Sequence, residues 1–487
     1  MKKKSLTVNA LLNGIKTIMS IVFPLISFPY VSRILQVDNI GKYNFAASVI
    51  SYFLMIAALG ISTYSVREGA KYVDDKEKLS EFASEIFTIN VLSTLVAYVL
   101  LVVCVFLVPK FQEYRALIYL LSIQIALVTI GVEWLYQIYE NYTYITIRSI
   151  VVQAASLILM FVLIRTEEDV YNYAVVTVLA AAGSNIFNWF HMRKMCKVHL
   201  TKHIKLKEHM KPIMIIFGTE IAKTVYVSSD TTILGFLATD YNVGLYSVST
   251  KIYTIIKSLL ASILIVSIPR LSGYLGNQKY EDYHKTLNDI ANALLMVSVP
   301  AMVGLICISD YVVELISGAN YLAATNSLRI LSVALLVSVF GWLFNSCVLI
   351  PYKKENKVLI TMIVSALLNI ILNLILIPRW KQDAAAFTTL LAEATALVMC
   401  AYYAKDLVKI KLNHRNLLST ILGSLLIVGI CMVMRLFDLN VIVNTVLTIS
   451  LSAVIYGLVL VAFKNPMLKY VKELLMKRHS PESTEEK

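Results

Sequence analysis

Four lysines lie inside long apolar segments of the sequence, where a charge is costly. They are Lys16, Lys223, Lys251 and Lys257. A charge at the centre of a membrane helix costs roughly 2.5–3.5 kcal/mol on insertion scales, so such residues usually face a hydrated cavity or a partner. For Lys16, Lys251 and Lys257, no acid lies three or four residues away in the sequence. This spacing favours a hydrated position facing an anionic ligand, although simply solvated lysines remain the alternative.

Four acids fall within the same kind of segment, namely Glu133, Glu220, Asp230 and Glu393. Glu220 lies three residues before Lys223, so the two charges could merely neutralise each other. Asp230 shares a helical face with Lys223 and could release it on protonation or cation binding. Glu133 and Glu393 could bind a coupling cation or pair with one of the lysines. The sequence leaves both interpretations open.

Two prolines, Pro24 and Pro29, lie in the same apolar segment as Lys16. Each removes a backbone hydrogen bond and displaces the preceding helical turn. Such prolines are often only tolerated kinks. On a helix that carries a charged side chain, they also predict a hinge.

The elements that carry these residues are segments of membrane-spanning length. About 20 consecutive apolar residues cross a bilayer as a helix, because lipid cannot satisfy free backbone groups. With 58% hydrophobic residues, a soluble globular chain is excluded. The pattern predicts an all-α polytopic membrane protein with about fourteen transmembrane helices. Their predicted centres lie near residues 22, 55, 96, 127, 156, 181, 225, 257, 298, 338, 367, 394, 427 and 452.

The net charge of +13 is explained by topology and not by nucleic acid. Of the 44 Lys and Arg residues, 31 fall in connections on the side of the amino terminus and nine on the other side. This bias predicts that both termini are cytoplasmic. Anionic lipid headgroups are the expected partner of the basic surface.

The chain divides near its middle, at the basic connection 192–211, which we interpret as a solvated linker. Motifs before and after it repeat in the same order, which predicts two parallel six-helix repeats with a binding site between lobes. The matching residues are Gly41 and Tyr43 with Gly244 and Tyr246, and Trp134 with Trp342. The predicted domains are a first lobe at 1–206, a second lobe at 207–410, two additional helices at 411–465 and a cytoplasmic tail at 466–487.

Signals for catalysis are missing from the sequence. It has no GxxxxGK[ST] loop for nucleotide phosphates and no HExxH zinc motif, and its seven histidines fall at or beyond cytoplasmic span ends. Its six cysteines show no metal-ligand spacing. We expect no catalytic residue, no metal site and no cofactor. Short external connections also argue against a polymerase or ligase of surface sugars.

An ordered set of motifs resembles Wzx-type polysaccharide flippases of the multidrug/oligosaccharidyl-lipid/polysaccharide exporter superfamily. The resemblance covers roughly residues 11–403, and the last two spans match only in number and hydrophobicity. The motifs are Phe28-Pro29-Tyr30 to Leu35, Gly41-Lys42-Tyr43, Leu59-Gly60-Ile61 to Glu68, Ser229-Asp230 to Gly235, Ser317-Gly318 to Leu331, and Asn369 to Asn373 with Pro378.

The resemblance implies two lobes around a cationic cavity, to which Arg33 of the first motif would contribute beside the four lysines. It implies transfer of undecaprenyl-diphosphate-linked oligosaccharide repeat units from the inner to the outer leaflet of the bacterial plasma membrane. The expected protein is a monomer and not an enzyme, with a polysaccharide polymerase and glycosyltransferases as candidate partners.

Other functions remain possible from the sequence. A lipid II flippase, which also has fourteen spans and a cationic cavity, is the first alternative. A drug/cation antiporter of the same superfamily is less favoured, because it typically has twelve spans and an acidic cavity. A membrane glycosyltransferase or polymerase is opposed by the short external connections.

Overall fold

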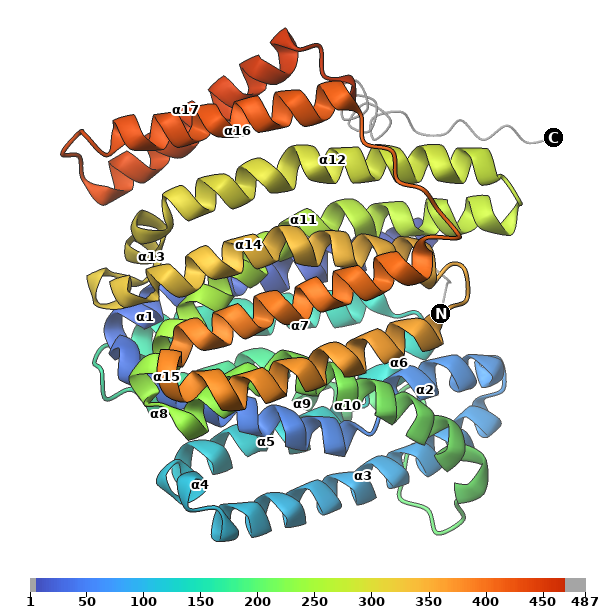
Figure 1. The fold of residues 1–487 in the computed structure, drawn as a ribbon. Coiled ribbons are helices and arrows are strands. Elements are labelled where there is room, and N and C mark those ends of the chain that lie inside the picture. Colours follow the sequence, from blue (N-terminus) through green and yellow to red (C-terminus); the bar gives the residue numbers. More distant parts are fainter. Residues whose placement is uncertain (1–5, 469–487) are drawn as a thin grey trace. The chain divides into compact units, whose positions relative to one another are not determined.

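The computed structural model describes the backbone of residues 6–468 and, in addition, the burial of Gly14, of Met19 and of residues 22–468. Within this range the regular elements are all helices (Figure 1). Eleven of the described helices are long and apolar enough to cross a membrane. The predicted all-α polytopic fold is confirmed, and every predicted span centre lies in a helix.

Two helices are long enough for two passes each. α1 (Leu6–Ala58) has 53 residues and a non-helical break at Gln36, where φ is 61°. α15 (Glu355–Ala404) has 50 residues and a similar break at Lys381, where φ is 50°. At 1.5 Å per residue the two arms of each broken helix together measure roughly 75–80 Å, more than twice the ~30 Å hydrocarbon core. The total of fourteen passes nevertheless stays a prediction.

Contacts divide the described part of the chain into two compact units, one up to Ser247 and one from Val248. The predicted lobes, 1–206 and 207–410, are defined by repeated sequence motifs and not by contacts, so their limits stay predictions. In the first unit, the long α1 packs against α3, α5, α7 and α10. The elements of this unit after α1 are α2 (Ile61–Gly69), η1 (Ala70–Tyr72), α3 (Lys76–Leu107), α4 (Pro109–Glu113), α5 (Arg115–Gly131), α6 (Glu133–Ile138), α7 (Tyr142–Leu163), α8 (Val170–Val178), η2 (Leu179–Gly183), α9 (Ser184–Met192), α10 (Leu206–Leu237) and the first turns of α11 (Asp240–Gly276).

Two glycines from the repeated motifs explain how closely α1 and the start of α11 approach. A Cβ atom at Gly41 would overlap the backbone carbonyl of Asp240, and one at Gly244 would overlap the carbonyl of Val37. Only glycine permits backbones to meet at this distance. The paired motifs therefore have a packing role in the first unit.

In the second unit, α14 packs extensively against α15, and α12 packs against both α14 and α16. The last two described helices, α16 and α17, pack on each other. Besides the rest of α11 and α15, the elements are α12 (Tyr280–Cys307), α13 (Ser309–Ser317), η3 (Ala319–Ala324), α14 (Thr325–Trp342), η4 (Leu343–Leu349), α16 (His414–Met434) and α17 (Val441–Ala462).

Large apolar side chains cover the outer faces of several helices. On α3, Val99 is 62% exposed and Phe106 is 71% exposed, and on α16 Leu425 is 62% exposed. Contiguous exposed apolar surface of this kind is suited to contact with lipid.

Candidate functional site

In the second unit, one of the predicted lysines forms a compact polar cluster with a predicted acid. The Nζ atom of Lys257 on α11 lies 2.7 Å from Oε1 of Glu393 on α15. The hydroxyl of Tyr253 accepts from Lys257 at 3.1 Å and donates to Glu393 at 3.2 Å. The side chain of Lys257 remains 26% exposed, whereas that of Glu393 is 10% exposed. The carboxylate therefore offsets the lysine charge, and the lysine side chain is the more exposed member of the pair.

Lys251 lies on the same helix as Lys257 and is half-buried. Its charge belongs to the second unit together with the cluster of Lys257 and Glu393. A half-buried basic side chain within a membrane helix keeps its charge only in polar or hydrated surroundings. Its assignment as a ligand-binding lysine stays a prediction.

In the first unit, Asp230 on α10 is buried, with 7% of its surface exposed. The hydroxyl of Tyr246 at the start of α11 donates a 2.8 Å hydrogen bond to Asp230 Oδ2. By contrast, Lys223 is 65% exposed and pairs with Glu220 at 3.7 Å. The predicted release of Lys223 by Asp230, on protonation or cation binding, would thus involve a buried acid and an exposed lysine. This release stays a prediction.

Hydroxyl groups connect α10 to α1 beside Asp230. Ser51 donates to Ser228 at 2.9 Å, and Thr232 donates to Ser48 at 2.9 Å. These bonds give the α1–α10 interface a polar strip next to the buried acid.

Glu133, the last of the predicted acids, pairs with Arg148, which is not one of the predicted site residues. Arg148 Nη2 lies 3.4 Å from Glu133 Oε2. Arg148 is one of the 31 basic residues assigned to connections on the side of the amino terminus. The structure instead places it inside α7, with its side chain 5% exposed. The apolar run from Tyr144 onward was the signal that could have placed it in a span.

The remaining predicted residues lie on α1. Arg33 is exposed, and its carbonyl accepts a 2.9 Å hydrogen bond from Gln36 at the helix break. Pro24 and Pro29 lie in α1, whose non-helical backbone is at Gln36, so the hinge stays a prediction. The side chain of Lys16 lies outside the described side chains.

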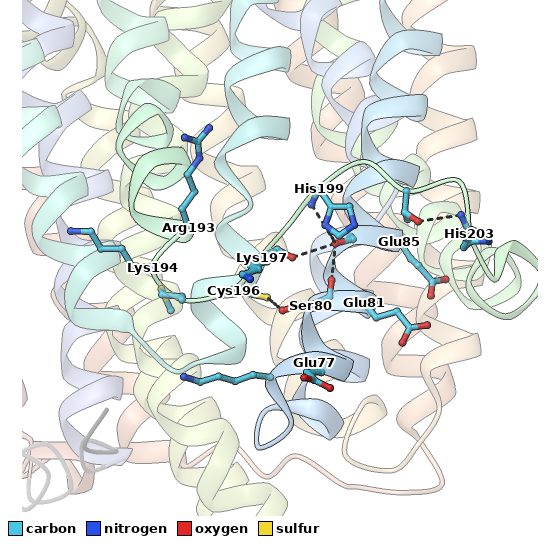
Figure 2. Close-up of a pocket in the computed structure, with 14 residues that line it drawn as sticks. Glu77, Ser80, Glu81, Glu85, Arg193, Lys194, Cys196, Lys197, His199 and His203 are labelled. Atoms are coloured by element: carbon cyan, nitrogen blue, oxygen red, sulfur yellow. Dashed lines mark hydrogen bonds between the residues drawn. The ribbon is translucent and has the colours of Figure 1, made fainter.

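A cavity of about 770 Å³ lies between the first turns of α3 and the basic connection before α10 (Figure 2). Glu77 and Glu81 line it from α3, and Arg193, Lys194 and Lys197 line it from the connection. The connection is therefore not only a solvated linker, because part of it forms the wall of a cavity with charges of both signs.

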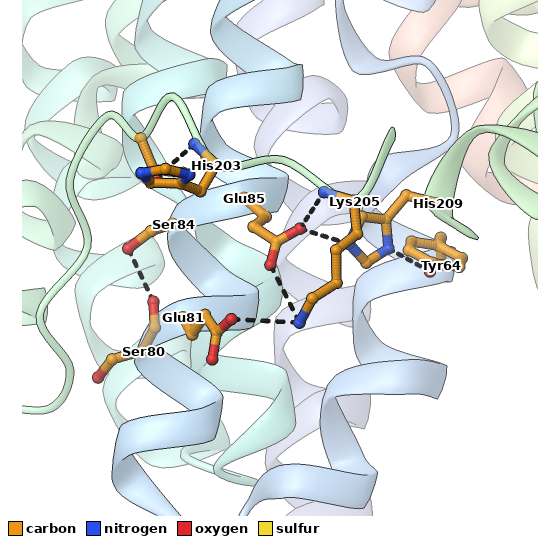
Figure 3. A network of polar contacts seen from close by, with 9 residues as sticks. Tyr64, Ser80, Glu81, Ser84, Glu85, His203, Lys205 and His209 are labelled. Carbon is orange, nitrogen blue, oxygen red and sulfur yellow. Dashed lines mark hydrogen bonds and ion pairs between the residues drawn. The ribbon is translucent and has the colours of Figure 1, made fainter. Parts of the chain in front are cut away.

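Glu85 anchors the end of this connection (Figure 3). Its Oε2 atom accepts from the backbone N–H of Lys205 at 2.7 Å and lies 3.1 Å from His209 Nε2. His209 Nδ1 lies 2.7 Å from the Tyr64 hydroxyl. The Lys205 ammonium contacts Glu81 at 3.1 Å, and this hydrogen bond raises the pKa of Lys205. Sequence reasoning missed the network because its members lie on three separate elements.

Comparison with known proteins identifies the family. A model described as polysaccharide biosynthesis protein matches residues 4–275, which is more than half of the chain. The chain belongs to this family. A second model, MatE, matches residues 216–375. The resemblance predicted from the sequence motifs is confirmed, and this family member is a multi-pass membrane protein.

Curated relatives include a protein of Escherichia coli (strain K12) named as an O-antigen transporter. It is 23% identical over 402 residues, covering 79% of this chain and 93% of the relative. An O-antigen transporter of Shigella dysenteriae is 24% identical and covers 69% of this chain and 84% of the relative. A low-salt glycan biosynthesis flippase of Haloferax volcanii is 24% identical and covers 42% of this chain and 43% of the relative.

Solved structures show the same fold. The lipid II flippase MurJ in an inward closed conformation aligns with a TM-score of 0.71 at 17% identity, covering 96% of this chain and 100% of that protein. An inward-facing MATE family transporter of the MOP superfamily aligns with a TM-score of 0.59 at 14% identity, covering 79% and 93%.

Proposed function

We propose that this protein is a flippase that moves undecaprenyl-diphosphate-linked oligosaccharide repeat units from the inner to the outer leaflet of the bacterial plasma membrane. The observation that carries the proposal is the polysaccharide biosynthesis family match over residues 4–275. It is supported by the O-antigen transporter of Escherichia coli, which is similar along 79% of the chain.

The intramembrane charges suit this substrate. A diphosphate and sugar headgroup needs a hydrated route with fixed positive charge, while the lipid tail can stay in the bilayer. Lys257 is held in place by Glu393, and its side chain as a whole is 26% exposed. A diphosphate oxygen could replace the carboxylate as its partner, because both are anionic oxygen acceptors. Further positive charge along the route would come from Lys251, Lys223, Arg33 and Lys16.

The proposal includes the orientation and the partners expected from the sequence. Both termini would be cytoplasmic, since the basic connections lie on that side. The protein would act as a monomeric transporter and not as an enzyme. Glycosyltransferases would supply the lipid-linked unit, and a polysaccharide polymerase would consume it after transfer.

A lipid II flippase is the alternative. The likeness to MurJ is a likeness of fold at 17% identity, so it is consistent with this alternative without favouring it. A drug/cation antiporter or a membrane glycosyltransferase is less favoured, because the curated relatives carry the names of an O-antigen transporter and a glycan flippase.

The two flippase functions differ in the precursor that accumulates when the protein is removed. Depletion in the native host should leave lipid-linked polysaccharide units inside the cell, with surface polysaccharide lost and cell shape preserved. Extraction and mass spectrometry of the lipid-linked precursors measure this directly. Accumulation of lipid II with cell lysis would overturn the proposal in favour of the alternative.

A further inference from the structure

Arg148 in α7 carries nitrogen atoms that the fold does not satisfy. The residue is 7% exposed, and neither Nε nor Nη1 has a hydrogen-bond partner among the described residues. Its Nη2 atom faces Glu133 at 3.4 Å, and its guanidinium lies 5.8 Å from the centre of the Tyr144 ring. A buried cationic donor without an acceptor is unfavourable, so this position calls for an anionic oxygen.

Arg148 lines a groove of about 590 Å³ along α7. Its other walls are mostly apolar, and Ile147, Val151 and Phe187 are 57%, 60% and 57% exposed. Asn141 and Thr143 line the groove at the end of α7 where the helix begins. The groove thus combines a cation and polar groups near one end with an apolar wall along the helix.

The position of the groove fits a lipid in one leaflet. α7 has 22 residues, so at 1.5 Å per residue it is about 33 Å long and matches the hydrocarbon core. Arg148 lies six residues after Tyr142, the first residue of α7, which places it about 9 Å along the helix. The predicted topology puts this end at the cytoplasmic face, where anionic lipids attract basic side chains.

We propose that this groove binds an anionic phospholipid of the bilayer, with its phosphate on Arg148 and an acyl chain along Ile147, Val151 and Phe187. Arginine is suited to phosphate because its planar guanidinium presents several donors. Glu133 lies on the Nη2 side of the guanidinium, and the buried Nε and Nη1 atoms, which lack acceptors among the described residues, are the donors that we assign to the phosphate. The site is distinct from the transported lipid and does not depend on the proposed function.

Lipid binding can be measured by native mass spectrometry of the purified protein with added phosphatidylglycerol. The double variant Arg148→Gln/Glu133→Gln keeps the local charge balanced while removing the cation. Val151→Trp fills the groove from an exposed position and leaves both charged residues in place. Arg165→Gln is the matched control, because this exposed arginine follows the opposite end of α7.

We expect at least a tenfold loss of phosphatidylglycerol affinity in the double variant and in Val151→Trp, and no change in Arg165→Gln. Phosphatidylcholine should bind more weakly than phosphatidylglycerol to the parental protein. Unchanged phosphatidylglycerol binding in Val151→Trp, whose fold is checked by its melting temperature, would overturn the proposal.

Two competing ligands test whether the groove instead binds the phosphate of another molecule. Undecaprenyl diphosphate without sugar should leave phosphatidylglycerol bound at this site, and so should inorganic phosphate. Displacement by the first would make the groove part of the transport route, and displacement by the second would make it a free phosphate site. Either result would overturn the assignment to a bilayer phospholipid while leaving the proposed transport function intact.

Discussion

Lys257 Nζ and Glu393 Oε1 lie 2.7 Å apart, which joins α11 to α15 through an ion pair. Tyr253 completes the cluster by hydrogen bonds to both side chains. The pair holds a lysine in position on a membrane helix without removing its charge. It therefore combines a structural contact between two helices with one of the cations that we propose for diphosphate binding.

Removing only the lysine of this pair should destabilise the protein. Lys257→Met leaves Glu393 largely buried without its cation, which typically costs about 3–5 kcal/mol in a buried pair. The double variant Lys257→Met/Glu393→Gln should recover most of that loss, because no unpaired charge remains. Thermal unfolding in detergent measures both variants. Lys223→Met is the control, since its pair with Glu220 is exposed and should contribute less than about 1 kcal/mol. Equal melting temperatures for the single and double variants would contradict the role of the pair.

The positive charge of Lys251 should be required for transport. Lys251→Ala should leave the protein level near normal but stop export of surface polysaccharide, with lipid-linked units accumulating inside the cell. Lys251→Arg should restore part of the export and Lys251→Glu none, because the sign of the charge decides phosphate binding. Lys16→Ala should behave in the same way. Normal export in both alanine variants would indicate lysines that are merely solvated.

Asp230 is the acid that we expect to couple transport to an ion gradient. A charge moved through 100 mV is worth about 2.3 kcal/mol, so one coupled cation could drive the step. Asp230→Asn should slow flipping in vesicles and abolish its response to an imposed proton or sodium gradient. Tyr246→Phe is the control, because it removes the 2.8 Å hydrogen bond but keeps the acid, and it should retain the response. A parental rate with a normal response in Asp230→Asn would assign this acid to packing.

The topology can be tested with single cysteines in a background that lacks the six native ones. Asn277→Cys should be shielded from an impermeant thiol reagent in intact cells, whereas Asn320→Cys should be labelled. Both asparagines are exposed in the structure, so a lack of labelling would reflect the side of the membrane and not burial. The reverse labelling pattern would invert the predicted orientation.

Helix positions were predictable from the sequence because lipid exposure imposes long apolar segments that each cross the bilayer. The role of Gly41 and Gly244 was partly visible as a repeated motif, but their close approach to Asp240 and Val37 requires the fold. The partners of the charged residues were not predictable. Lys257 and Glu393 are 136 residues apart in the sequence, and helical spacing reports only neighbours on one helix.

Arg148 also shows that the partners of a charged residue cannot be predicted from the sequence. The sequence pattern assigns it to a connection, whereas the structure places it within α7. In the fold, Glu133 and the Tyr144 ring face the guanidinium within α7, while its Nε and Nη1 atoms lack hydrogen-bond partners among the described residues. Burial of a charge depends on partners from other elements, so neither hydropathy nor spacing along the chain reveals it.

In the proposed function, the protein itself moves a lipid-linked oligosaccharide between leaflets. Purified protein in vesicles, with a fluorescent undecaprenyl-diphosphate-linked oligosaccharide distributed over both leaflets, tests this through a membrane-impermeant quencher. We expect protein-containing vesicles to lose nearly all fluorescence, because inner-leaflet substrate reaches the outside, and vesicles with Lys251→Ala to retain about half. Retention of half the fluorescence by vesicles containing the correctly folded parental protein would show that it does not transfer this substrate.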